Sequence, residues 1–415
     1  MARYLALLLP LALWLSGCAQ GPQPSEEAAT KPIQDSGAVV TLEEEAIKAI
    51  EDMGGYVGRD HKAPGNPPVK VLFDGTEITE ACWKPLSAIK GLKELEFHCV
   101  TIEAGGLKGV KQLRNLQSLT IGCMWIADAA LEDLDGLKEL RALRSLTIWP
   151  KCTDANLKTL KELKTLQELN LGGTQITDAG LKELKELKDL QELWLNGNQI
   201  TDAGLKELKG LGNLRTLGLG YTRVTDAGLK ELRDLKNLHE LGVSATAVTG
   251  DGLRELTSLQ KLYLSSAPIT DAQMKGIEAL TNLQELDLSE TKITSLGLAM
   301  LKELKCLQRL NLGDTEITDA GLKELRALEN LQELDLHGTA ITDAGMKEIK
   351  ELKSLKELNL GRAYGVTDAG LQELKRLDGL RHLNIMEIMG ITKAGLKDLR
   401  EALPNCEIYP PLARD

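Results

Sequence analysis

The residues of this chain that could do chemistry do not come together in any pattern that catalysis requires. Its five histidines are scattered, and no serine-hydrolase, metalloprotease or phosphate-loop motif is present. Acidic residues are plentiful, but they recur with a fixed period that the architecture alone explains. The cysteines show no metal-ligand spacing. The sequence therefore predicts no enzyme, no cofactor and no metal site.

One cysteine stands in a motif with its own chemistry. Arg3 supplies a positive start, residues 5–15 are apolar, and residues 15–18 read Leu-Ser-Gly-Cys. This segment resembles the lipobox of bacterial lipoproteins, in which cleavage before the cysteine leaves that residue to carry lipid. An ordinary secretory leader is the alternative, and the apolar run is too short for a membrane span. We therefore expect a signal peptide over residues 1–17 and a lipid on Cys18. The expected location is the bacterial cell envelope, either in the outer membrane or facing the periplasm.

A phrase of about 24 residues recurs through most of the chain. Its core, Thr-Asp-Ala-Gly-Leu, begins at Thr177 and returns unaltered at Thr201, Thr225, Thr318 and Thr367. Alignment on the first leucine of each copy gives fourteen units, which start at residues 68, 92, 116, 143, 166, 190, 214, 238, 259, 283, 307, 331, 355 and 380. Such a period predicts a stack of identical modules with a long surface rather than a catalytic pocket.

Each unit reads as a strand, a turn and a helix. Leu169 and Leu171 alternate with period two, which indicates a short strand with its leucines inward. After the turn, Leu181, Leu184 and Leu187 recur every three residues on one face of a helix. The Thr or Asp of the phrase is the expected helix cap. Position nine of most units holds a side chain that can bond buried turn backbone: Thr76, Thr174, Asn198, Thr222, Thr246, Thr291, Thr315 and Thr339.

These repeats resemble the ribonuclease-inhibitor-like and cysteine-containing branch of the leucine-rich repeat family. The resemblance covers roughly residues 68 to 403. It implies an α/β solenoid shaped as a curved horseshoe, with parallel strands on the concave side, helices on the convex side, and usually protein recognition. The chain departs from this branch at position nine, where it has mostly threonine in place of cysteine. No F-box sequence precedes the repeats, so the ubiquitin-ligase adaptor role of some relatives is not carried over.

The remaining segments complete the expected domain organisation. Residues 18–40 are poor in large apolar side chains and read as a flexible tether. Residues 41–66 read as an N-terminal helical cap over the open end of the solenoid, which spans 67–403. Residues 404–415 read as a C-terminal cap and tail that begins with one last strand.

Two cysteines occupy equivalent places in adjacent repeats. Cys99 and Cys123 both stand at position eight, which would place them on neighbouring strands about 5 Å apart. A disulfide is within reach at that separation, and an exported protein meets oxidising conditions. Two independent thiols are the alternative. Cys152 falls at an inward isoleucine position and is expected in the core.

The concave face is where we expect a partner to bind. Side chains at positions three, five and seven of each unit should point out from the sheet. The basic occupants are Lys70, Lys261 and Arg309, whereas the acidic ones are Asp74, Glu94, Glu96, Glu168, Glu192, Glu240, Glu285, Asp287, Glu333, Asp335 and Glu357. This surface should be negative and attract a basic partner. Alternatively, glutamate at position three only solvates the repeat.

Aromatic side chains sharpen this expectation. They fall in the units that start at 143 to 259, where glycines surround them, and exposed aromatic rings on a rigid sheet are typical binding anchors. Alternatively, the rings only cover neighbouring sheet. Trp83, by contrast, stands at an inward position and should be core. The expected partner-binding residues are Trp149, Trp194, Tyr221, Tyr263, Glu192 and Glu240.

These observations favour a lipid-anchored envelope protein that binds a protein partner on its concave face. The formal net charge of −11, without any basic block, argues against nucleic-acid binding. Membrane contact is expected only through the lipid on Cys18. The alternatives are a scaffold or spacer without a specific ligand, and a binder of a cell-envelope polymer.

Overall fold

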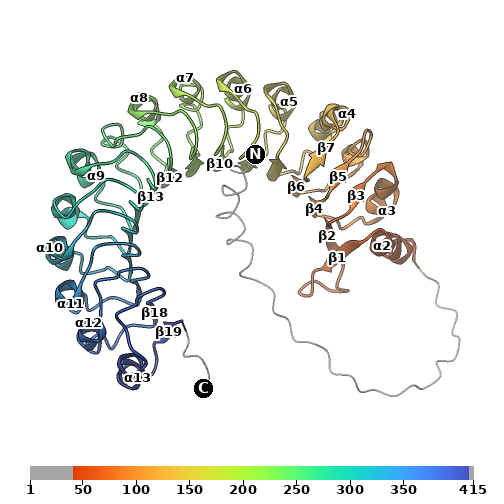
Figure 1. Cartoon of the computed structure of the whole chain (residues 1–415). Coiled ribbons are helices and arrows are strands. Elements are labelled where there is room, and N and C mark those ends of the chain that lie inside the picture. The colour runs from red at the N-terminus through yellow and green to blue at the C-terminus, as the bar shows by residue number, and fades with distance from the viewer. Residues whose placement is uncertain (1–40, 411–415) are drawn as a thin grey trace, which may run out of the picture. The chain divides into compact units, whose positions relative to one another are not determined.

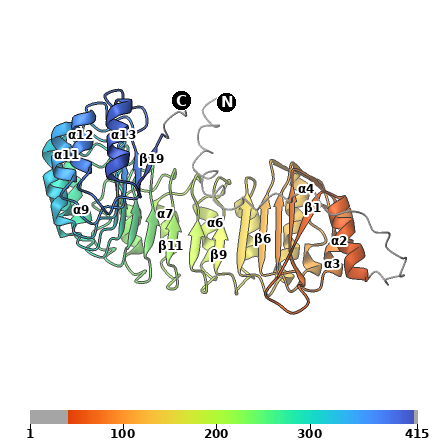
Figure 2. The ribbon, with the colours of Figure 1, turned by 90° about the horizontal axis from the view of Figure 1, so that it is seen from below.

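The computed structural model describes residues 41–410. The segments expected to be a signal peptide and a tether, with Cys18 between them, lie outside this range, as do residues 411–415. Taken by itself, the folded unit that begins at Leu42 is a curved ribbon of repeats. Its strands line the concave side and its helices stand on the convex side, as Figure 1 and Figure 2 show. The predicted solenoid architecture is confirmed.

One sheet runs through the whole described unit, with a single strand from each repeat. Strand β1 (Gly55–Arg59) pairs antiparallel with the first repeat strand, and the following strands are parallel in chain order. These strands are β2 Pro68–Asp74, β4 Glu94–His98, β6 Ser118–Gly122, β8 Ser145–Trp149, β9 Glu168–Asn170, β10 Glu192–Trp194, β11 Thr216–Gly218, β12 Glu240–Gly242, β13 Lys261–Tyr263, β14 Glu285–Asp287, β15 Arg309–Asn311, β16 Glu333–Asp335, β17 Glu357–Asn359, β18 His382–Asn384 and β19 Glu407–Tyr409. A second small sheet joins β3 Glu77–Ile78, β5 Thr101–Ile102 and β7 Trp125–Ile126.

The convex side carries short helices. The α-helices that follow the repeat strands are α3 Trp83–Ala88, α4 Asp128–Glu132, α5 Asp154–Leu160, α6 Asp178–Leu184, α7 Asp202–Leu205, α8 Asp226–Leu229, α9 Met274–Glu278, α10 Asp319–Leu322, α11 Asp343–Ile349, α12 Asp368–Leu374 and α13 Lys393–Ala402. The 3₁₀ segments are η2 Glu80–Cys82, η3 Val110–Gln112, η4 Asp133–Glu139, η5 Lys230–Leu232, η6 Asp271–Gln273, η7 Gly297–Glu303 and η8 Lys323–Ala327. The shortest repeat spans 238–258, and the residues between β12 and β13 form only turns.

The helix predicted from leucine spacing is shorter than expected. α6 ends at Leu184, so Leu187 lies in the turn beyond the helix, yet its side chain is fully buried. A spacing of three residues suits a 3₁₀ turn as well as an α-helix, because both bring side chains three apart to one side. The burial was therefore predicted correctly and the helix end was not.

The two ends of the solenoid are covered by additional elements. Helix α2 (Leu42–Asp52) packs Ile47 and Ile50 onto the first repeats. The antiparallel strand β1 follows it and was not predicted, because residues 41–66 were read as a helical cap. At the other end, β19 forms in the segment where a last strand is expected.

The core is one continuous column of inward side chains. The leucines of each strand, such as Leu169 and Leu171, are fully buried and belong to a single apolar cluster. Trp83 is buried as predicted, and its indole Nε1 donates to the carbonyl of Gly106 at 2.8 Å. Cys152 is also fully buried. Because every repeat contributes one layer, each layer packs against the next and is stabilised by it.

Hydrogen bonds between successive repeats explain the recurring Thr-Asp-Ala-Gly phrase. Thr201 begins α7 and its hydroxyl accepts from the backbone N–H of Ala203, so threonine is the helix cap. Asp178 of the preceding repeat instead accepts from the backbone N–H of Thr201 at 2.8 Å and from its hydroxyl at 2.6 Å. The aspartate therefore joins neighbouring repeats, and of the two predicted capping residues threonine is the one that caps the helix.

The glycine of the phrase makes room for this aspartate. A Cβ on Gly204 would lie 2.4 Å from Oδ1 of Asp178 and 2.9 Å from Cδ1 of Leu181, which is too close for any side chain. The same close approach recurs between Gly228 and Asp202, at 2.4 Å. The Thr-Asp-Ala-Gly phrase therefore encodes one contact between neighbouring repeats, and the contact recurs along the solenoid.

Position nine also stabilises the turns as predicted. The hydroxyl of Thr222 donates to the carbonyl of Leu219 at 2.6 Å, and the other buried threonines at this position bond in the same way. Asn198 extends the pattern, since its amide donates both to Leu195 of its own repeat and to Leu171 of the previous repeat. Thr76 departs from it, because its buried hydroxyl has no hydrogen-bond partner in the described part of the chain.

Candidate functional site

Because successive strands pair in register, their outward side chains form two rows along the concave face. Glu168, Glu192 and Thr216 lie opposite one another on β9, β10 and β11, and each is at position three of its repeat. Position five follows the same register two residues later. Neighbouring side chains in a row are therefore about 4.8 Å apart, close enough to interact.

The two predicted tryptophans lie against glycines of neighbouring repeats. A Cβ on Gly218 would lie 2.5 Å from Cε3 of Trp194, so the indole lies over this glycine. A Cβ on Gly173 would similarly lie 2.9 Å from Nε1 of Trp149. Both rings are half-buried, so each covers sheet on one side and leaves the other side open.

The predicted tyrosines occupy different places. Tyr263 lies in the position-five row, and its hydroxyl donates to Oε1 of Glu285 at 3.1 Å. Burial, followed by the nearby Glu285 and Glu240, raises the pKa of this phenol. Tyr221 instead lies in a turn with a φ of 57° and is 52% exposed. The four aromatic residues are thus spread over several strands and do not form one cluster.

The two predicted glutamates have distinct surroundings. Burial raises the pKa of Glu192, and the charges of Glu168 and Glu240 raise it further, although a hydrogen bond from Trp194 opposes them. Glu240 forms an ion pair with Lys261 at 3.5 Å. This part of the face is therefore acidic but partly neutralised.

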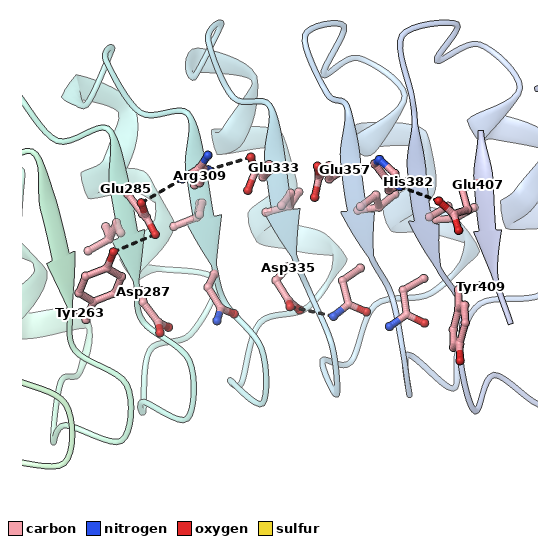
Figure 3. Close-up of a pocket in the computed structure, with 18 residues that line it drawn as sticks. Tyr263, Glu285, Asp287, Arg309, Glu333, Asp335, Glu357, His382, Glu407 and Tyr409 are labelled. Carbon is pink, nitrogen blue, oxygen red and sulfur yellow. Dashed lines mark hydrogen bonds and ion pairs between the residues drawn. The ribbon is translucent and has the colours of Figure 1, made fainter. Parts of the chain in front are cut away.

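A groove that the sequence analysis did not single out lies further along the concave face. It has a volume of about 560 Å³ and crosses the strands from β13 to β19 (Figure 3). Tyr263 lies at one end and Tyr409 at the other, as Figure 3 shows. We call it the C-terminal groove. Its polar lining consists of Tyr263, Glu285, Asp287, Arg309, Asn311, Glu333, Asp335, Glu357, Asn359, His382, Asn384, Glu407 and Tyr409.

The lining of the C-terminal groove is arranged in the two rows. Position three supplies longer side chains, from Glu285 on β14 to Glu407 on β19. Position five supplies only aspartate or asparagine in five successive repeats, between the two tyrosines. Short side chains between aromatic ones leave the floor hollow. This arrangement explains why the face is hollowed between the two tyrosines.

Carboxylates dominate the charge of the C-terminal groove. Six of its lining residues are acidic and one, Arg309, is permanently cationic. The Arg309 guanidinium bonds Glu333 at 2.7 Å and Glu285 at 3.3 Å, so it is already matched. His382 lies 3.5 Å from Glu407. The remaining carboxylates give the groove a net negative charge.

Part of this groove was foreseeable from the sequence. The sequence predicted that these lining residues point outward: Tyr263, Glu285, Asp287, Arg309, Glu333, Asp335 and Glu357. Aromatic anchors, however, were expected only in the units that start at 143 to 259. Tyr409 was missed because it belongs to the last strand, which no full repeat follows. The row of short Asp and Asn side chains at position five was the signal that would have located the groove.

The structure joins Cys99 and Cys123 by a disulfide, with their Cα atoms 4.5 Å apart. This bond links the ends of two neighbouring repeats. Two exposed apolar side chains follow Cys123 in the chain: Met124 is 78% exposed, and Trp125 at the start of β7 is 55% exposed. The predicted partner-binding set did not include these two residues, and they lie away from the C-terminal groove.

The described residues contain no group of three or more His, Cys, Asp or Glu side chains that could hold a metal ion. Among residues 41–410, none of the helices is both long enough and apolar enough to cross a bilayer.

Comparison with protein families identifies the repeats. Models of leucine-rich repeats match residues 164–207, 257–317 and 327–350, the first as two copies. The chain is a leucine-rich repeat protein. None of the curated proteins compared with this leucine-rich repeat protein matches it.

Solved structures share the fold of this leucine-rich repeat protein. An internalin from Listeria monocytogenes is 21% identical, with a TM-score of 0.57, over 82% of this chain and 94% of the internalin. A leucine-rich repeat protein from Leptospira interrogans is 23% identical, also with a TM-score of 0.57, over 82% of this chain and 89% of its own. At this level of identity the likeness concerns the fold alone.

Proposed function

We propose that this leucine-rich repeat protein binds a protein partner along its concave face. The C-terminal groove is the observation that carries the proposal, because it hollows part of that face and is lined by charged and aromatic side chains. Trp194 and Glu192 extend the same face towards the N-terminus. Aromatic anchors beside charged groups are typical of protein-binding surfaces.

We also propose that the chain is anchored to a bacterial envelope membrane by lipid on Cys18. The Leu-Ser-Gly-Cys sequence at residues 15–18 supports this anchor, and the polar segment 19–40 would separate it from the solenoid. The Thr-Asp-Ala-Gly-Leu phrase further supports placing the repeats in the ribonuclease-inhibitor-like, cysteine-containing branch. The resulting function is that of an envelope receptor or adaptor without catalysis.

Proximity labelling of the anchored protein in its own cell tests partner binding. The comparison is between the unaltered chain and a Trp194→Ala/Tyr263→Ala double variant. Loss of a labelled protein in the variant supports the concave face. A partner that survives both changes counts against this part of the face, and the absence of any enriched protein favours a spacer. Enrichment of envelope polymer instead of protein favours the polymer-binding alternative.

Membrane fractionation tests the anchor separately. Cys18→Ala should release the protein from the membrane fraction and abolish incorporation of a labelled fatty acid, because no other residue would carry lipid. Cys306→Ala is the matched control, since this exposed thiol lies within the solenoid and should not affect the anchor. Continued lipid labelling of Cys18→Ala would show that the anchor is elsewhere.

A further inference from the structure

We propose that the C-terminal groove binds an extended basic peptide segment, with lysine or arginine side chains paired to Asp287, Asp335 and Glu357. This inference rests on the proposed function and specifies the chemistry of the partner. The segment would lie across the strands from Tyr263 to Tyr409. Its charges, its length and its backbone each follow from a separate feature of the groove.

The first feature is the supply of carboxylates without cationic partners. In the described structure Glu357 forms no ion pair, and Arg309 is already shared between Glu285 and Glu333. Asp287 is bonded only by Ser289. Burial raises the pKa of Asp287; the hydrogen bonds from Ser289 oppose this rise, and the charge of Asp335 adds to it. A cation placed between these carboxylates would relieve their mutual repulsion.

The second feature is the length of the groove. Six steps between neighbouring strands separate β13 from β19. At about 4.8 Å per step this distance is roughly 29 Å along the sheet, which an extended chain of about eight or nine residues spans. Tyr263 and Tyr409 close the two ends, and their rings can also receive a cation on the ring face.

The third feature distinguishes a peptide from a simple polycation. Asn311 and Asn384 each accept a backbone N–H through Oδ1, from Gly313 and Met386 respectively, at 3.0 Å. Their amide Nδ2 groups therefore remain as donors on the floor. Carbonyl oxygens of a peptide backbone would accept these hydrogen bonds, whereas a polyamine offers no acceptor. The floor thus provides donors for the backbone and carboxylates for the side chains.

A synthetic peptide tests the inference directly. The probe is an eight-residue peptide of alternating lysine and serine that carries a neutral dye, with binding measured by fluorescence anisotropy at low salt. The same peptide with glutamate in place of lysine should not bind. Asp335→Asn/Glu357→Gln should weaken binding by about tenfold or more, because two of the three pairing carboxylates are lost. Tyr409→Ala gives a second variant at the end of the groove and should weaken binding several-fold.

The control removes the same number of carboxylates from the concave face outside the groove. Glu94→Gln/Glu168→Gln neutralises two position-three carboxylates on β4 and β9 and should leave peptide affinity within about twofold. An equal loss in this control would show only attraction to a negative protein, and would overturn the inference. Circular dichroism of each variant confirms that it is folded.

Two further arms separate a peptide from a polyamine. Asn311→Ala/Asn384→Ala should weaken peptide binding several-fold and leave the affinity for spermine unchanged. If spermine binds as tightly as the peptide and this double variant binds the peptide normally, the occupant is a polycation and the inference fails. If cellular labelling still depends on the concave face while no groove variant affects the peptide, the proposed function stands and only the groove inference falls.

Discussion

At the scale of single residues, the aspartate of the repeated phrase acts on the next repeat rather than on its own helix. Asp202 accepts from the backbone N–H of Thr225 at 2.8 Å and from its hydroxyl at 2.7 Å. The sequence predicted that threonine or aspartate caps the helix, and threonine does so. The role of the aspartate could not be predicted from the sequence of one repeat, because its hydrogen-bond partner lies in the next repeat.

Removing one of these aspartates should therefore destabilise the solenoid. In Asp202→Ala the backbone N–H and hydroxyl of Thr225 lose their acceptor, which should lower the free energy of unfolding by about 1–3 kcal/mol. Urea denaturation followed by circular dichroism measures the change. Asp189→Ala is the control, because this aspartate is exposed. Equal midpoints for the two variants would contradict the inter-repeat role.

The glycine of the phrase gives an independent prediction. Gly204→Ala places a methyl group 2.4 Å from Oδ1 of Asp178, so either the hydrogen bonds to Thr201 or the spacing of the repeats must change. We expect a loss of about 1–3 kcal/mol. Gly212→Ala is the matched control, because a Cβ there meets nothing within 4 Å. A destabilisation of Gly212→Ala as large as that of Gly204→Ala would refute the steric explanation.

The same aspartates should make stability depend on pH. Burial alone would raise the pKa of Asp226, but hydrogen bonds from Gly252, Thr249 and Gly250 outweigh it and lower the pKa. The folded chain thus holds this carboxylate ionised to lower pH than the unfolded chain does. The advantage of the unaltered protein over Asp226→Asn should be full above about pH 5 and shrink below about pH 4. Urea midpoints at several pH values measure it, and a constant difference would contradict it.

At the scale of elements, the place of each cysteine within its repeat determines whether its thiol can react. Burial raises the pKa of Cys82 and of Cys152 to about 12, whereas Cys306 is exposed. Iodoacetamide should therefore modify Cys306 in the folded protein and leave Cys82 and Cys152 unmodified until denaturant is added. Mass spectrometry of the digested protein measures this pattern. Rapid native labelling of Cys152 would show that its repeat is open.

The disulfide joins two cysteines that lie just beyond strands β4 and β6. Cys99 and Cys123 should appear as one linked peptide pair before reduction, and the Cys99→Ala/Cys123→Ala variant should melt at a lower temperature. The sequence placed these cysteines side by side because the repeat period fixes their register. The sequence did not decide between a disulfide and two independent thiols, because the approach of two sulfur atoms depends on the turn geometry.

Element boundaries were less predictable than the repeat itself. The fourteen strand positions follow from leucine spacing, because burial of one face requires it. The helices vary from α to 3₁₀, and the shortest repeat has turns in their place. Leucines three residues apart are compatible with each of these shapes. Strand β1 was not foreseen, because its pairing with β2 depends on the open edge of the first repeat.

At the scale of the whole described unit, stacking leaves the concave face as the surface for recognition. The C-terminal groove draws one to three residues from each of seven successive strands, so no local motif encodes it. The sequence analysis predicted that this face is acidic. It could not predict the hollow, which arises where short side chains recur between two tyrosines across different repeats.

Site-specific photo-crosslinking in the anchored, full-length protein tests this account most directly. A photoreactive residue at Asn311 lies on the floor of the groove, whereas one at Lys347 lies on helix α11 of the convex side. The account predicts a discrete crosslinked protein from Asn311 that disappears in Asp335→Asn/Glu357→Gln, and none from Lys347. Crosslinks from Lys347 together with none from Asn311 would contradict it.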